Sequence, residues 1–130
     1  MSAMLVAAGL WSTAAGAAGS WVASAPAMTV VMAEREMSSA SLAPPTPHLA
    51  RGERIGSIRW RYRVATDAAV NARLCQAERC VALPGPRGQT DALAGGDAQA
   101  PLRFRFTLAE KGQRAVRVEG LQVIVNHEAP

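Results

Sequence analysis

Two segments of the chain alternate large apolar and polar side chains with a period of two residues. Between Ile58 and Val64, apolar residues occupy every second position and three arginines lie between them. The segment from Leu102 to Leu108 repeats the pattern, with large apolar residues at its even positions. Successive side chains of a β-strand point to opposite faces, so both segments are predicted to be strands with one buried and one wet face.

Other segments extend this β-rich pattern. Residues 121–126 are nearly continuously apolar and rich in β-branched side chains, which favours a strand that lies centrally or is covered on both sides. Residues 28–32 are a weaker candidate of the same kind, and no segment shows a convincing helical period. Residues 38–47 and 84–101 are rich in Pro, Gly and polar residues and are predicted to be loops, the second long enough to be mobile or functional.

These elements predict an all-β fold, an antiparallel β-sandwich or small barrel of about six to seven strands. The 130 residues suit a single domain. Hydrophobic residues make up 49% of the chain, but many are alanine and aromatics are only 5%. The core must therefore depend on Val, Leu, Ile and a few large side chains.

The N-terminal segment contains no ionisable side chain before Glu34. Residues 3–18 are apolar, and residues 15–17 supply the small side chains that a signal peptidase requires. Glycine, serine and threonine interrupt the run, and alanine and glycine contribute little insertion energy, so a membrane anchor is disfavoured. We expect a signal peptide over 1–18 and a single β-domain over 19–130 in the periplasm, with no transmembrane segment after cleavage. A basic n-region is missing, so either the true start lies upstream or the signal is a poor one.

The two cysteines, Cys75 and Cys80, predict a disulfide across a β-hairpin whose loop is 76–79. An exported chain with an even cysteine count fits an oxidising compartment. Pairing the cysteines puts four apolar residues on the opposite face of the hairpin: Ala72, Leu74, Val81 and Leu83. A redox pair is usually spaced more closely, and a zinc site needs four ligands, whereas the only histidines, His48 and His127, are distant.

Five arginines on the wet strand faces, with Trp21 near the mature N-terminus, are the candidate partner-binding residues. The five are Arg59, Arg61, Arg63, Arg103 and Arg105. Like charges directly opposite on neighbouring strands destabilise a sheet, so we expect these arginines to be paired with acidic residues or to meet an acidic partner. The acidic candidates lie beside strand ends, at Glu53, Asp67, Glu110 and Glu119. Full internal pairing is not expected, and a screened, solvated face is the simpler alternative.

Catalysis, cofactors and nucleic acid are not expected. His48 lies in a Pro-rich loop and His127 lies near the C-terminus, and neither place favours a precisely held base. Asp91 and Asp97 are separated by Gly95 and Gly96, which make their loop too soft to hold an acid pair. The net charge of +4 comes almost entirely from arginine, which by itself is weak evidence for nucleic-acid binding.

Several short motifs occur together in a recognisable order. They are Gly19-Ser20-Trp21, Trp60-Arg61-Tyr62, Leu74-Cys75 with Cys80-Val81, Pro101-Leu102-Arg103-Phe104 and Gln122-Val123-Ile124-Val125-Asn126. In order and spacing they resemble the flagellar FlhE family of small periplasmic proteins, over essentially the whole mature chain. The final residues 127–130 depart from the pattern, which would have an aromatic residue after the asparagine.

The resemblance implies an exported, β-rich accessory without catalysis. It implies partners among the flagellar export-gate, rod or hook components. It also implies a chaperone-like or regulatory role in flagellar export, rod assembly and swarming, including control of proton leakage through the gate.

Two alternatives stay open. One is a carbohydrate or peptidoglycan module that stacks sugars on Trp11, Trp21, Trp60 and Tyr62. Trp11 would leave with the signal, and Trp60 and Tyr62 share an apolar strand face, which favours core packing. The sequence leaves open whether Trp21 stacks on a sugar or packs in the core. The other alternative is a structural envelope protein without a fixed partner.

Overall fold

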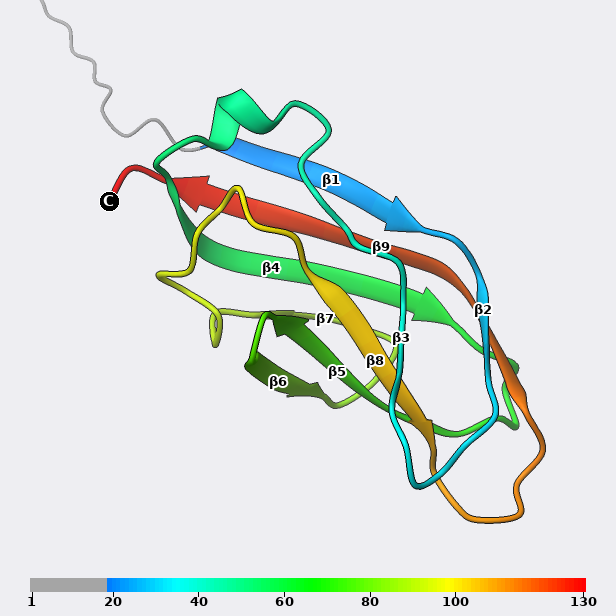
Figure 1. The fold of residues 1–130 in the computed structure, drawn as a ribbon. Helices are drawn as coiled ribbons and strands as arrows, with labels where there is room; N and C mark the ends of the chain where they lie inside the picture. Colours follow the sequence, from blue (N-terminus) through cyan, green and yellow to red (C-terminus); the bar gives the residue numbers. More distant parts are fainter. Residues whose placement is uncertain (1–18) are drawn as a thin grey trace, which may run out of the picture.

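The alternating segments form facing strands of an antiparallel β-sandwich. The computed structural model describes residues 19–130, so the signal predicted over 1–18 lies outside the described residues. One sheet contains β1 (Gly19–Ala25), β9 (Val116–Glu128), β4 (Arg54–Arg63) and β7 (Arg87–Thr90) in that order, with β2 (Met28–Val30) also paired to β9. The second has the order β3 (Met37–Ser38), β8 (Arg103–Leu108), β5 (Val70–Gln76) and β6 (Arg79–Leu83). Figure 1 shows the two layers and η1 (Pro47–Ala50), a short 3₁₀ turn near β1.

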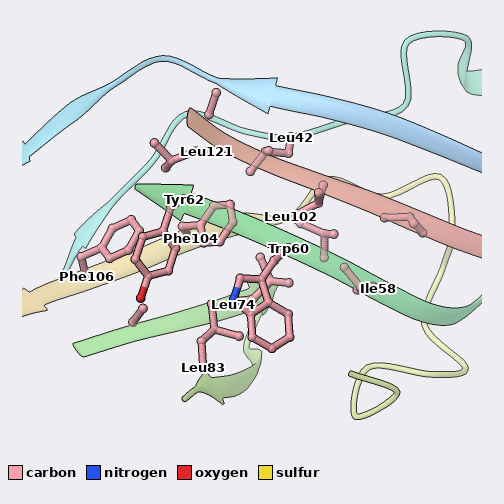
Figure 2. Close-up of a cluster of buried hydrophobic side chains, with 14 of the residues drawn as sticks. Leu42, Ile58, Trp60, Tyr62, Leu74, Leu83, Leu102, Phe104, Phe106 and Leu121 are labelled. Carbon is pink, nitrogen blue, oxygen red and sulfur yellow. The ribbon is translucent and has the colours of Figure 1, made fainter. Parts of the chain in front are cut away.

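The core lies between the two sheets and uses the predicted apolar positions. Tyr62 of β4 contacts Phe106 of β8 edge to face, with ring centroids 5.2 Å apart. Phe104 stacks on Phe106 at 5.8 Å, and these two side chains are fully buried. Figure 2 shows these three rings grouped together, with Leu74 and Leu83 beside the ring of Trp60. The few aromatic residues thus join β4 and β8 across the sandwich, where each large ring contributes more buried area than an aliphatic side chain.

The all-β antiparallel prediction is confirmed, although the described residues form nine strands rather than six or seven. The predicted central position of residues 121–126 is also confirmed, because β9 pairs with β1, β2 and β4. At Gly120 the chain adopts a φ of +63°, close to a register irregularity between β4 and β9. Glycine suits this left-handed conformation because it has no Cβ.

The prediction of one continuous loop over residues 84–101 is wrong, since β7 lies within it. Alternation could not reveal β7 because its inward positions are Thr90 and Gly88, and Gly88 lies directly opposite Trp60 of β4. A Cβ added at Gly88 would lie 2.6 Å from Cη2 of the Trp60 ring. The indole ring therefore occupies the space that an apolar side chain of β7 would have filled.

Candidate functional site

The five predicted arginines lie on opposite outer faces of the sandwich. Arg59, Arg61 and Arg63 project outward from β4, where they alternate with buried core residues. Arg103 and Arg105 alternate with buried phenylalanines on β8, which belongs to the other sheet. The inner faces of β4 and β8 meet through their aromatic rings, so these arginines point away from one another. The structure thus gives two separate basic groups instead of one.

The charge of the group on β8 is neutralised in part by Glu36, which was not among the acidic candidates named from the sequence. Glu36 accepts hydrogen bonds from Nε and Nη2 of Arg73, at 2.6 and 2.7 Å, and its Oε1 lies 4.0 Å from Nη1 of Arg105. Arg73 and Arg105 are directly opposite each other on β5 and β8. The hydrogen bonds from Arg73 lower the pKa of Glu36 below its ordinary value. Glu36 thereby offsets the repulsion between two facing arginines.

Arg103 is held by a backbone acceptor. Its Nη1 donates to the carbonyl oxygen of Ser39 at 3.2 Å. A small hollow beside it is lined by the side chains of both Arg103 and Arg105 and by the disulfide residue Cys75. On the β8 side, Arg73 and Arg105 therefore share one carboxylate and Arg103 donates to a backbone carbonyl oxygen. Nε of Arg105 is buried without a hydrogen-bond partner among residues 19–130.

The group on β4 is different, because only its last member has an acidic neighbour. Nη2 of Arg63 lies 3.8 Å from Oε1 of Glu119, and both side chains are exposed. Glu119 is closer to Arg117, whose Nε donates to it at 2.9 Å and lowers the pKa of the carboxyl group. Of the four acidic candidates named from the sequence, Glu119 is the one that reaches a predicted arginine.

The remaining two arginines of β4 meet β7, which the sequence did not reveal. Nε of Arg59 donates to Oε1 of Gln89 at 3.2 Å. Arg61 lies directly opposite Arg87 in the β4–β7 register. No ion pair within residues 19–130 includes Arg59, Arg61 or Arg87. This is the destabilising like-charge arrangement, and here no carboxylate of the described residues relieves it.

These side chains line a groove on the outer face of the larger sheet, which we call the basic groove. Its volume is about 460 Å³. Its lining residues are Arg59, Trp60, Arg61, Arg87, Gly88, Gln89, Gln122 and Ile124. Three cationic groups, two amides and one aliphatic side chain make a surface suited to carboxylates on an extended ligand. The basic groove is the candidate functional site.

A larger hollow, of about 730 Å³, lies where β9 begins. Its lining includes Arg63, Arg114 and Arg117 but also Asp67 and Glu119. Because both signs of charge are present, this hollow offers less electrostatic selectivity than the basic groove.

Trp21, the remaining predicted contact residue, lies in the core. Its side chain is buried, and its indole N–H donates to the carbonyl oxygen of Ala98 at 2.9 Å. Trp60 and Tyr62 are buried as well, and Trp60 donates its indole N–H to the carbonyl oxygen of Gly85. Rings packed in this way do not present open faces on which a sugar could stack, so we leave Trp21 out of the candidate surface.

The disulfide and the hairpin register agree with the sequence prediction. Cys75 and Cys80 are bonded, and their Cα atoms lie 4.0 Å apart. The predicted cross-strand pairs of Leu74 with Val81 and of Ala72 with Leu83 are both present. The loop is shorter than 76–79, because residues 76 and 79 are themselves paired and Ala77 turns the chain with a φ of +53°.

His127 has a structural contact that the sequence did not predict. It lies in β9 with its side chain buried, and its Nδ1 is hydrogen-bonded to Oε1 of Glu53. A Cβ added at Gly19 would lie 2.7 Å from the imidazole ring, so β1 passes closely over it. Within residues 19–130 no three His, Cys, Asp or Glu side chains cluster as metal ligands would. No helix of these residues is long and apolar enough to cross a membrane.

Comparison with known proteins identifies one family. The family described as flagellar protein FlhE matches residues 28–128. A flagellar protein FlhE of Yersinia enterocolitica is 35% identical over 115 residues, covering 85% of this chain and 82% of the relative. The Escherichia coli K12 protein of the same name is 35% identical, with 84% and 85% covered. A solved crystal structure of FlhE superposes with a TM-score of 0.75 at 32% identity, covering 85% of this chain and 96% of that one.

Proposed function

The chain belongs to the FlhE family of flagellar proteins, and on this premise we propose that it is a non-enzymatic accessory of the flagellum that works in the periplasm. It binds a component of the export gate, rod or hook during assembly. The role is chaperone-like or regulatory, it supports swarming, and it includes limiting proton leakage through the gate.

Family membership over residues 28–128 is the observation that carries this proposal. The structure supports a binding role because the outer sheet face carries the basic groove, whose arginines have no acidic partner among residues 19–130. Three uncompensated cations on a fixed sheet attract an acidic surface and steer its approach. A rigid surface of this kind is what an accessory needs to hold an assembling subunit.

Two features support the periplasmic location. The Cys75–Cys80 disulfide belongs to an oxidising compartment. The uncharged lead over 1–18, with small residues before the proposed cleavage point, has the composition of a signal peptide. We expect intact-mass measurement of the native protein to give a chain that starts near Ala18.

The test begins with deletion of the gene in its own bacterium, followed by swarming and flagellar assembly measurements. We expect the deletion to impair swarming and the full-length gene to restore it. The purified mature protein should then bind one of the purified rod, hook or export-gate components. Saturable binding to cell-wall fragments, without binding to any flagellar component, would favour the peptidoglycan-module alternative and contradict the proposal.

A further inference from the structure

The open edge of the larger sheet coincides with the basic groove. β7 is the last strand of the path β1-β9-β4-β7, so one side of it has no neighbouring strand among residues 19–130. Figure 1 shows β7 at the side of the sheet away from β1. Of its four residues, Arg87, Gly88 and Gln89 are exposed. An unpaired edge of this kind is a template for another strand.

The hydrogen bonds between β4 and β7 show which backbone groups are free. The N–H of Tyr62 donates to the carbonyl oxygen of Pro86 at 2.8 Å, so that pair is hydrogen-bonded. Hydrogen-bonded and non-hydrogen-bonded pairs alternate along an antiparallel ladder. In the β4–β7 register, the Arg61–Arg87 and Arg59–Gln89 pairs are therefore non-hydrogen-bonded. The backbone N–H and C=O groups of Arg87 and Gln89 point away from β4, toward the open side.

These backbone groups have no partner among residues 19–130. The other edge of the same sheet is more protected, because η1 lies beside β1 and Leu49 helps to line a hollow with Val22. Natural sheets guard a free edge by keeping the strand short or by placing charges or proline on it. β7 is four residues long and carries the charge of Arg87, which disfavours a basic strand and favours an acidic one.

We infer that β7 accepts an extended acidic segment of a partner protein as an additional strand, whose carboxylates are bound by Arg87 and Arg61. The inference deepens the proposed function by naming the chemistry of the partner segment. Every second side chain of the added strand would lie on the outer face, and the one opposite Arg87 would be within reach of its guanidinium, because neighbouring strands lie about 4.8 Å apart. Arg61 lies one strand further in. Backbone hydrogen bonds between β7 and the added strand supply affinity, and the arginines select acidic over basic segments.

Separate variants test the open backbone edge of β7 and the charge of the arginines. Gln89→Pro removes the side-chain amide and the backbone N–H, which points away from β4, and proline is tolerated at such edge positions. Gln89→Ala is its control, because it keeps the N–H while losing the side chain. Arg87→Glu reverses a charge of the basic groove. Arg114→Glu makes the same change in net charge at an exposed residue outside the basic groove.

The probe is an eight-residue peptide in which threonine and glutamate alternate, with blocked ends. Binding to the full mature protein is measured by fluorescence anisotropy, and the contact residues by amide shifts in NMR. We expect Gln89→Pro to bind about tenfold or more weakly than Gln89→Ala, and Arg87→Glu about tenfold or more weakly than Arg114→Glu. Arg114→Glu itself should change binding less than about threefold. The largest amide shifts should occur in β7.

Circular dichroism and thermal unfolding confirm that each variant is folded. Equal binding by Gln89→Pro and the wild type would show that the peptide meets only a charged surface, and would overturn the inference. Absence of binding at millimolar peptide would overturn it as well. A lysine peptide of the same length should bind more weakly, and the reverse result would contradict the role of the arginines.

Complementation separates this inference from the proposed function. If the wild-type gene restores swarming to the deletion strain and folded Gln89→Pro restores it fully, the β7 edge is dispensable and only the inference fails. If deletion of the gene leaves swarming and assembly unchanged, the proposed function itself fails, whatever the peptide measurements show.

Discussion

Replacing Gly88 with alanine tests the contact that gives β7 its place in the sheet. A Cβ at this position would lie 2.6 Å from Cη2 and 2.7 Å from Cζ2 of Trp60, both closer than two carbon atoms can approach. Trp60 cannot move aside freely, because it is buried and its Nε1 lies 3.0 Å from the carbonyl oxygen of Gly85. Overpacking of this kind costs about 1–3 kcal/mol.

A second effect partly offsets that cost. Alanine in place of glycine reduces the freedom of the unfolded chain and stabilises a protein by about 0.4–1 kcal/mol where the backbone allows it. We therefore expect Gly88→Ala to lower the free energy of unfolding by about 1–2 kcal/mol. Gly85→Ala is the matched control, since an added Cβ there meets nothing within 4 Å. It should leave stability unchanged or raise it by up to about 1 kcal/mol, because only the unfolded-state effect operates there.

The measurement is urea unfolding followed by far-ultraviolet circular dichroism, which does not depend on tryptophan fluorescence. Trp60→Phe shortens the ring and should relieve the clash, so the double variant with Gly88→Ala should be more stable than the sum of the two changes predicts. We expect a coupling energy of at least about 1 kcal/mol between the two positions. Additive effects, or a Gly88→Ala protein as stable as the wild type, would refute the steric reasoning.

Three further predictions concern other parts of the structure. Serine at both Cys75 and Cys80 should cost about 2 kcal/mol and leave a folded protein at 25 °C in circular dichroism, because the closed ring is short. The hydrogen bonds from Arg73 hold the pKa of Glu36 below its ordinary value, so Glu36 stabilises the fold above its unfolded-state pKa and loses this contribution as pH falls through the lower folded-state pKa. Because its side chain is 32% exposed, Glu36→Gln should cost only about 0.5–1 kcal/mol at neutral pH and nothing in acid, as measured by urea unfolding against pH. Trp21→Phe should cost about 1–3 kcal/mol in the same assay, since it leaves a buried carbonyl oxygen without its donor.

The sequence by itself determined which face of each main strand is buried. In β4 and β8 the period-two alternation assigned the inward aromatic residues and the outward arginines correctly. It also determined the hairpin register, because Cys75 and Cys80 are close in the chain and their pairing sets every neighbouring pair. Both results depend on local geometry, which a short segment contains in full.

Only the tertiary structure decided which strands lie side by side, because strand pairing depends on the fit of distant segments. Alternation places Arg61 and Arg105 on wet faces but does not say that their strands lie in different sheets. Arg61 faces Arg87 only because β7 pairs with β4. The sequence of β7 shows no apolar alternation, because the ring of Trp60 fills the space beside Gly88. The basic groove is therefore formed by residues whose proximity no local pattern records.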